Sequence, residues 1–273
     1  MKGQEKASLE LDTFFLNELK GFGIPELKTY GRIKHNTFYA IVMEYLGPSL
    51  DVLFKKQKRK FSLKTTCMLG IQMIDRIEFL HSKKYIHRDI KPSNFLMGRG
   101  EKSHVLYLCD FGISKKYWTN DGHVDEKYLG KFAGTEKYAS VNSIKGNQQS
   151  RKDDLISIAY VLINFLNGSL PWDVGKDDEQ KLSIKISTKI QDLCKGLPKE
   201  IYEFLWCIDT LKFNEVPKYK KLKNFLRDAV INSKEKIDYK YDWFTKIPNI
   251  NDEDDILKDH YNIDYNSNDW LNY

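Results

Sequence analysis

The stretch HRDIKPSNF, His87 to Phe95, places a base, an acid, a lysine and a carboxamide within nine residues, between two runs of apolar sequence. Asp89 carries a carboxylate that can take a proton, and Lys91 supplies a positive charge two residues later. In an extended chain this spacing lets both side chains project the same way. We therefore expect Asp89 and Lys91 to act on one reacting group, such as a phosphoryl group in transfer.

A second polar motif, Asp110-Phe111-Gly112, follows the apolar run HVLYLC. Mg²⁺ prefers oxygen ligands and keeps phosphate oxygens among them, so Asn94 and Asp110 suit a nucleotide-bound metal. Each of these residues alone is most often a turn or capping residue. Together, in the order Asp89, Asn94 and Asp110, they match the general arrangement in which one Asp accepts a hydroxyl proton while Asn and a second Asp hold Mg²⁺.

Length and composition agree with an enzyme in solution. The chain has 273 residues, 41% hydrophobic and 30% charged, and no apolar run approaches the roughly 18 residues of a membrane span. The first residues, MKGQEKASLELD, lack the apolar core of a secretory signal, which predicts a cytoplasmic or nuclear protein. Four scattered cysteines without a CxxC pair are interpreted as packing residues.

Charge is distributed unevenly along the chain. Residues 249–273 hold seven acids and one lysine, a net charge of −6, so the preceding residues carry +12 and the whole chain +6. A basic body implies anionic partners, which include nucleic acid, lipid headgroups, phosphates and acidic peptides. The Asn/Asp-rich tail is predicted to be flexible.

Hydrophobic periodicity predicts a mixed α+β chain. An amphipathic helix over 8–20, with Leu11, Phe14 and Phe15 on one face, ends at GFGIP, and a hairpin with a turn at His35-Asn36 follows. Short strands are expected around NFLM and HVLYLCD. The predicted helices of the remaining chain cover 61–84, 153–166, 199–211 and 219–230.

These elements predict a small sheet-bearing part, residues 1–46, and a larger helical part, residues 47–248, followed by the tail at 249–273. The segment Glu44-Tyr45-Leu46-Gly47-Pro48 lies between the two parts like a hinge. Clefts between two such parts are favoured ligand sites.

The chain resembles the casein kinase 1 family of Ser/Thr protein kinases from about Ser8 to Phe244. The stretches that carry the resemblance are GFGIPELKTYG, VMEYLGPSL, KKYIHRDIKPSNFLMG, LCDFGISKKY, GTEKYASVN, SRKDDLISIAYVL, GSLPW, LCKGLP and YDWF. The most specific is GTEKYASVN, because this family has a Ser-Ile-Asn-like sequence where most protein kinases have Ala-Pro-Glu. The resemblance implies a protein-kinase-like fold and transfer of the ATP γ-phosphoryl group, with Mg²⁺, to protein Ser/Thr hydroxyls.

The resemblance also implies an ATP site. Met43 matches the gatekeeper residue, Glu44 to Leu46 match the hinge whose backbone meets adenine, and Leu96 matches the floor of the adenine pocket. Glu10 matches the helix glutamate that pairs with the ATP-binding lysine, in an alignment with one extra residue before Gly21.

Catalytic and substrate roles follow from the same resemblance. Thr135 matches a threonine that bonds the catalytic Asp and Lys, and Asp154 matches a carboxylate that bonds the backbone of the catalytic loop. Lys137 matches part of a basic pocket for a phosphate or acidic side chain of the substrate, with Lys185 a second candidate. The implied partners are acidic or pre-phosphorylated proteins, with no nucleic acid, and the implied state is a monomer.

The N-terminus of the chain differs from that of the family, and this difference leaves more than one interpretation of the function. Only nine residues precede Glu10, where the family has a Gly-rich loop and a lysine-bearing strand, so the chain is interpreted as an N-terminally truncated member. The alternatives are a pseudokinase scaffold that binds partners through its helical part and a small-molecule phosphotransferase. The second of these gives no reason for Lys91-Pro92 or for GTEKYASVN.

Overall fold

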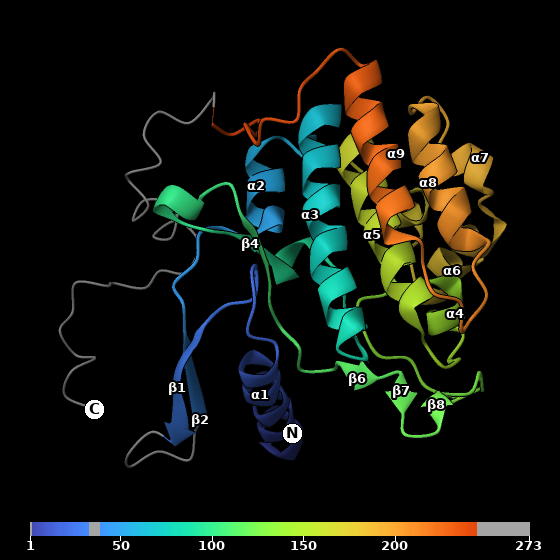
Figure 1. Cartoon of the computed structure of the whole chain (residues 1–273). Coiled ribbons are helices and arrows are strands. Elements are labelled where there is room, and N and C mark those ends of the chain that lie inside the picture. Colours follow the sequence, from blue (N-terminus) through green and yellow to red (C-terminus); the bar gives the residue numbers. More distant parts are fainter. Residues whose placement is uncertain (1, 33–38, 245–273) are drawn as a thin grey trace.

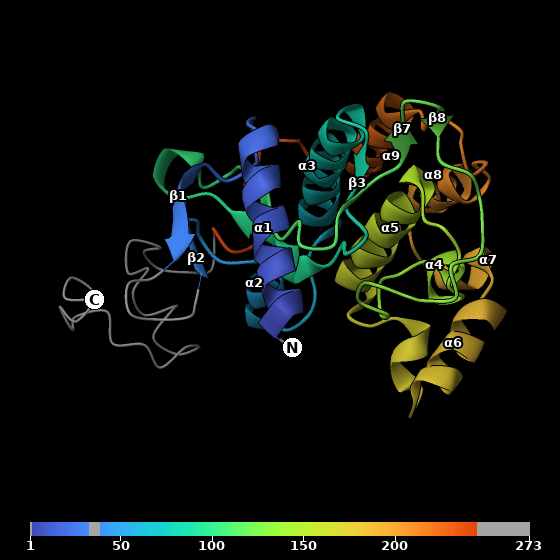
Figure 2. The ribbon, with the colours of Figure 1, turned by 90° about the horizontal axis from the view of Figure 1, so that it is seen from below.

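The small N-terminal part consists of one helix and one hairpin. The computed structural model describes residues 2–32 and 39–244. Helix α1 (Lys2–Glu18) is followed by strands β1 (Leu27–Arg32) and β2 (Tyr39–Met43), which pair antiparallel. This confirms the predicted hairpin, while its predicted turn at His35-Asn36 lies outside the described residues. Figures 1 and 2 show α1 between the hairpin and the helical part.

Helix α1 begins earlier than predicted and turns a different face inward. Phe15 and Leu16 are buried, whereas Leu11 and Phe14 are 38% and 44% exposed. The expectation that Leu11 and Phe14 share the buried face was therefore wrong. The ring of Phe15 stacks on that of Phe111 in the second motif, with the ring centroids 5.5 Å apart, and meets the ring of Phe14 edge-on at 5.4 Å. The contact with Phe111 sets the rotation of α1.

The large part is built around α3 (Leu63–Ser82), which follows the short α2 (Leu50–Lys56). Ser49 and Ser62 start these helices, because each hydroxyl accepts a hydrogen bond from a backbone N–H three residues later. Every side chain of α3 from residue 65 to 74 is buried. The helix is thus central rather than buried along one side only.

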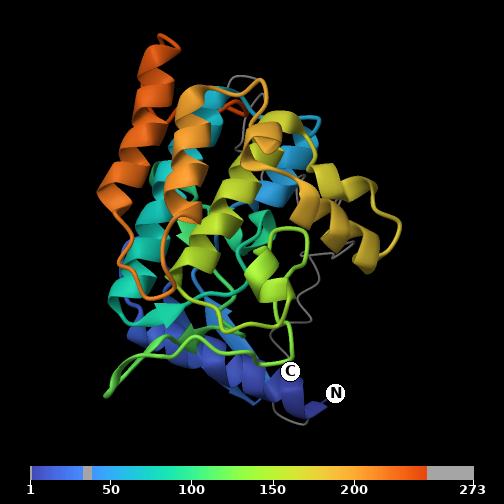
Figure 3. The ribbon, with the colours of Figure 1, turned by 90° about the vertical axis from the view of Figure 1, so that its right-hand side faces the viewer.

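Helices α5 (Arg151–Asn167), α8 (Lys199–Asp209) and α9 (Tyr219–Asn232) complete the bundle, close to their predicted bounds. A Cβ at Gly70 of α3 would lie 2.8 Å from Leu162 of α5 and from Leu226 of α9, so glycine allows the three helices to approach closely. Figure 3 shows the bundle standing above α1.

Short strands connect α3 to α5 and carry the polar motifs. Strand β3 (Tyr85–Ile86) pairs with β6 (Lys115–Lys116), and β4 (Phe95–Met97) pairs with β5 (Leu106–Leu108). The 3-10 turns η1 (Pro92–Asn94) and η2 (Gly100–Lys102) precede and follow β4. Strands β7 (Trp118–Thr119) and β8 (Gly122–His123) form a further hairpin.

Several short elements were not predicted. Those after residue 140 are α4 (Val141–Ile144), η3 (Pro171–Val174), α6 (Asp178–Ser187) and α7 (Ile190–Leu193). In Figure 2, α6 lies at the edge of the bundle, beside α4 and far from α1. No helix in the ranges 2–32 and 39–244 is long and apolar enough to span a bilayer. The four cysteines are free thiols, and three of them are buried.

Candidate active site

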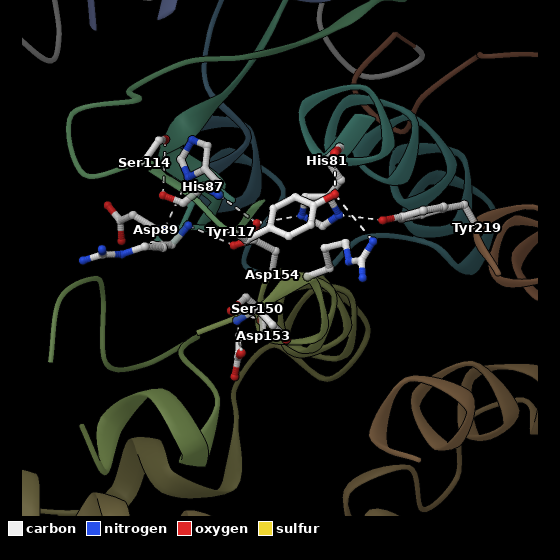
Figure 4. A network of polar contacts seen from close by, with 12 residues as sticks. His81, His87, Asp89, Ser114, Tyr117, Ser150, Asp153, Asp154 and Tyr219 are labelled. Carbon is white, nitrogen blue, oxygen red and sulfur yellow. Dashed lines mark hydrogen bonds and ion pairs between the residues drawn. The ribbon is translucent and has the colours of Figure 1, made fainter. Parts of the chain in front are cut away.

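The polar stretch at 87–94 forms a loop between β3 and β4, and a carboxylate from α5 holds its backbone. Asp154 accepts hydrogen bonds from the N–H of His87 at 2.8 Å and of Arg88 at 2.9 Å (Figure 4). Arg88 has a φ of +73°, a conformation that L residues rarely adopt. The two bonds to Asp154 stabilise this turn, in agreement with the role expected of Asp154.

Asp154 is itself oriented by residues that the sequence did not point to. His81 of α3 contacts its carboxylate through Nε2 at 3.0 Å, and the other ring nitrogen contacts the hydroxyl of Tyr219 of α9 at 2.7 Å. Burial lowers the pKa of His81. Burial by itself raises the pKa of Asp154, but the hydrogen bonds from His81 and from the backbone N–H of His87 prevail, and its pKa lies below the ordinary value. The histidine therefore donates from Nε2 to Asp154 and accepts from Tyr219 at Nδ1.

The candidate base, Asp89, is 8% exposed and held on both oxygens. One oxygen lies 2.6 Å from Lys91 Nζ, and the other accepts from the hydroxyl of Thr135 at 2.6 Å. Burial alone raises the pKa of Asp89, but the bonds from Lys91 and Thr135 outweigh it and hold the pKa below its ordinary value. Asp89 is thus ionised at neutral pH and able to accept a proton.

Asn94 and Asp110 fit a hard cation. The amide nitrogen of Asn94 donates to the backbone oxygen of Asp89 at 2.9 Å and to its carboxylate at 3.3 Å, which leaves the amide oxygen as an acceptor. Asp110 is exposed, with a φ of +63°. Its only hydrogen bond within the described residues comes from the N–H of Gly112, at 3.4 Å. An amide oxygen and a carboxylate of this kind are oxygen ligands suited to Mg²⁺.

The acid of α1 that contacts the second motif is Asp12, not Glu10. The carboxylate of Asp12 accepts from the N–H of Phe111 at 2.6 Å. Burial raises the pKa of Asp12 to about 6, and the charge of Asp110 adds to this rise. Glu10 is exposed and lines a separate pocket between α1 and the hairpin. The two acids lie two residues apart, and only the packing of α1 shows which one reaches Phe111.

The expected hinge lines a pocket of about 690 Å³. Met43, Glu44, Leu46 and Leu96, the residues expected around adenine, all contribute to its wall. The side chain of Glu44 is turned to the opposite side, where it accepts from the hydroxyl of Tyr107 at 3.2 Å. The hinge therefore offers its backbone to the pocket, and the N–H of Leu46 donates to no acceptor within the described residues.

The segment after β8 brings Thr135 to Asp89. Gly134 has a φ of +128°, and a Cβ there would lie 2.5 Å from the backbone oxygen of Arg88, so only glycine allows this approach. Further on, the hydroxyl of Ser140 donates to Asp153 of α5 at 2.5 Å, and the amide of Asn142 contacts the same carboxylate at 3.4 Å. The Ser-Val-Asn sequence thus fixes the end of this segment to α5.

The two lysines of the expected anion pocket are arranged differently from the prediction. Lys137 is about one-third exposed and pairs with Asp173 at 2.6 Å. Lys185 is 4% exposed, and its ammonium donates to three backbone oxygens. Lys185 therefore does not present its charge to a substrate.

A different cationic cluster, which the sequence analysis missed, lies beside the catalytic loop. The positive charges of Arg88, Lys127 and Lys131 all act on Lys115 and, after burial, lower its pKa. The Nε of Arg88 is buried without a hydrogen-bond partner among the described residues. Arg88 of the catalytic loop, and Lys127 and Lys131 of the segment before Thr135, thus add their positive charge to that of Lys115 on β6, and such a concentration of charge attracts anions.

These groups meet between the small part and the helical part, which is the arrangement of an enzyme that transfers a phosphoryl group to a hydroxyl. Residues 16–236, more than half of the chain, match the family model described as protein kinase domain. The chain belongs to the protein kinase family, and its α+β fold with a mainly helical second part is the fold of that family.

Proposed function

We propose that the chain is a Ser/Thr protein kinase of the casein kinase 1 type, which transfers the ATP γ-phosphoryl group to hydroxyls of protein substrates. The observation that carries this proposal is the 2.6 Å bond from Thr135 to Asp89, because it joins the segment that presents a peptide to the group that takes the proton. The Ser140-Val141-Asn142 sequence, bound to α5 through Asp153, supports the subfamily.

In this proposal each residue has its own role in the transfer of the phosphoryl group. The substrate oxygen forms a bond to the γ-phosphorus, the bond from that phosphorus to the bridging oxygen of ADP breaks, and the hydroxyl proton passes to Asp89. Lys91, 2.6 Å from Asp89, places a cation beside the transferring group. Asn94 and Asp110 would hold Mg²⁺, which neutralises phosphate charge when bound.

The proposal is tested with Asp89→Asn, measured as transfer of labelled phosphate to a serine peptide at saturating Mg²⁺-ATP. The change is nearly isosteric and removes the proton acceptor, so we expect turnover to fall by about 10²–10⁴-fold with an unchanged circular dichroism spectrum. Asp121→Asn, at an exposed turn outside the site, is the matched control. Wild-type turnover in Asp89→Asn would contradict the assignment of the base.

We also propose that the substrates are acidic or pre-phosphorylated, as the cationic cluster of Arg88, Lys115, Lys127 and Lys131 supports. Charged hydrogen bonds of this kind contribute about 1–3 kcal/mol and weaken with salt. A pre-phosphorylated peptide should therefore react faster than its unphosphorylated twin, and Lys131→Met should reduce the difference while Lys199→Met, on α8, leaves it intact. Equal rates for the two peptides would exclude this preference.

A second candidate function is a scaffold with the kinase fold and little catalysis. Within the described residues the sheet beside α1 contains β1 and β2 alone, and Asp12 pairs with no cation. Both features would lower the affinity of the site for ATP. Retained phosphoryl transfer that depends on Asp89 would exclude this candidate.

A further inference from the structure

Lys185 is a buried cation with an unusually complete set of partners. It is the one buried lysine in 9–31 and 39–244, where the structure describes the side chains, and it projects from the last turn of α6. Its Nζ lies 2.7 Å from the backbone oxygen of Glu136, 3.1 Å from that of Lys137 and 2.9 Å from that of Ala139. An ammonium has three N–H donors, so all of them are used.

Aromatic rings enclose the same ammonium. Nζ lies 4.5 Å from the ring centroid of Trp172 and 5.3 Å from that of Tyr160. Both rings can stabilise a cation over their faces. The indole N–H of Trp172 donates at 2.8 Å to the backbone oxygen of Lys137, one of the oxygens that Lys185 also binds.

Burying an ammonium is unfavourable unless its hydrogen bonds are met, and burial indeed lowers the pKa of Lys185 to about 7. The charged groups that face it are Glu136 and Asp173, and both act against this lowering. A methionine of similar length would fill the same space without that cost. The unfavourable free energy of burying this charge is offset by hydrogen bonds to a single segment, residues 136–139.

That segment is the continuation of Thr135. The N–H groups of Tyr138 and Ala139 each donate at 3.1 Å to the backbone oxygen of Thr135, which makes residues 135–139 one turn. Lys185 binds the outward oxygens of this turn, while the Thr135 hydroxyl binds Asp89. Any motion of the turn therefore displaces the hydroxyl that contacts the base.

We propose that Lys185 is a positioning residue, which fixes the 135–139 turn and through Thr135 orients Asp89 and the peptide hydroxyl. The anion-pocket role expected from the sequence is thus replaced by a role in the backbone beneath the peptide. The inference depends on the proposed protein kinase function only for its kinetic part.

Hydrogen exchange of the purified chain tests the proposal without activity. Lys185→Met removes all three donors, so amides in residues 135–140 should exchange about tenfold faster or more, as expected for losing hydrogen bonds to a charged group. Amides in the middle of α3 should keep their rates. Lys185→Arg, which restores a cation and its donors, should return the turn to within about threefold of the original chain.

Lys181→Met is the matched control, because Lys181 is one turn earlier on α6 and pairs with exposed Asp178. The proposal is overturned if Lys185→Met leaves exchange at 135–140 at the control level. It is equally overturned if α3 accelerates as much as the turn, since that is a general loss of stability. If Lys185→Met does not fold, the exchange experiment uses Lys185→Gln, which keeps two N–H donors without the charge. The same two outcomes would then overturn the proposal.

The kinetic part compares KM and kcat. Lys185→Met should lower kcat for a serine peptide by about tenfold and leave KM for ATP within about twofold, because the hinge pocket is not touched. Unchanged kcat would contradict the link through Thr135. A chain with no transfer activity at all would disprove the proposed function and leave the exchange experiment as the test of Lys185.

Discussion

Asp12 shows at the scale of one residue how packing selects between similar groups. Successive acids two residues apart on a helix point to nearly opposite sides. The structure turns Asp12 to the N–H of Phe111 and leaves Glu10 exposed. No local pattern contains this choice, because it depends on the stacking of Phe15 on Phe111.

The raised pKa of Asp12, about 6, has a consequence for stability. The folded protein therefore binds a proton at Asp12 more tightly than the unfolded chain does. At a pH where Asp12 is ionised in both states, its carboxylate lowers the free energy of unfolding. This penalty disappears as the pH falls from about 6 towards 4. Asp12→Asn keeps the acceptor for Phe111 without the charge. In Mg²⁺-free urea titrations it should be more stable than the original chain at pH 7, by on the order of 1–2 kcal/mol after allowance for partial exposure, and the gap should narrow below pH 6.

Glu18→Gln provides the comparison, because Glu18 is an exposed acid on the same helix. Its stability curve should run parallel to that of the original chain from pH 5 to 8. If the Asp12→Asn curve also runs parallel, Asp12 is not a titrating group of the folded state.

At the scale of elements, sequence periodicity predicts the helices that bury apolar stripes and misses those that do not. Helices α8 and α9 bury such a stripe, and α3 and α5 are buried on almost all sides, so all four leave an apolar pattern in the sequence. Helix α6 has the sequence DEQKLSIKIS, and its one buried side chain is the cation Lys185, while Ile186 is 50% exposed. A helix anchored by hydrogen bonds to backbone oxygens leaves no apolar period in its sequence.

Helix α9 is coupled to the catalytic loop through its first residue. The ionised carboxylate of Asp154 can only accept, so it keeps the imidazole proton of His81 on Nε2, and Tyr219 donates to Nδ1. Tyr219→Phe leaves a buried acceptor unsatisfied, at a cost of about 1–3 kcal/mol. We expect the ¹⁵Nδ1 resonance of His81 to shift, because this nitrogen loses its donor, and kcat to fall by about tenfold, because the ring that orients Asp154 is less firmly held.

Tyr117→Phe is the matched control, because the hydroxyl of Tyr117 donates at 2.7 Å to the backbone oxygen of His81 and not to its ring. It should lower stability without shifting the Nδ1 resonance. Identical NMR spectra and kinetics for the two variants would mean that Tyr219 contributes packing and nothing more.

At the scale of the whole molecule, the proposed reacting groups are easier to find in the sequence than the residues that support them. Asp89, Asn94 and Asp110 lie within a short span of chain, so one motif and its neighbour reveal them together. Their supports, among them His81 and Tyr219, come from distant helices. Such contacts exist only after the bundle has formed, and a single sequence holds no record of them.

The last prediction concerns nucleotide affinity. The described residues build one side of the proposed nucleotide cleft: the hinge, Leu96 and the two proposed metal ligands, Asn94 and Asp110. On the other side, α1 contributes Asp12, which pairs with no cation in the described residues, and the sheet there has two strands. Backbone N–H groups over the phosphates and a lysine beside them normally supply much of the binding energy in this family.

We therefore expect the 273-residue chain to bind Mg²⁺-ATP with a dissociation constant in the millimolar range, about 4 kcal/mol, rather than the micromolar range, about 8 kcal/mol. Isothermal titration with Mg²⁺-ATP measures this directly. Adenosine should bind almost as well as ATP, since the hinge side is intact and the phosphates meet few donors. A low-micromolar constant that Asp110→Asn weakens would show instead that further residues of the chain close the cleft over the phosphates, and it would remove the structural support for the scaffold alternative.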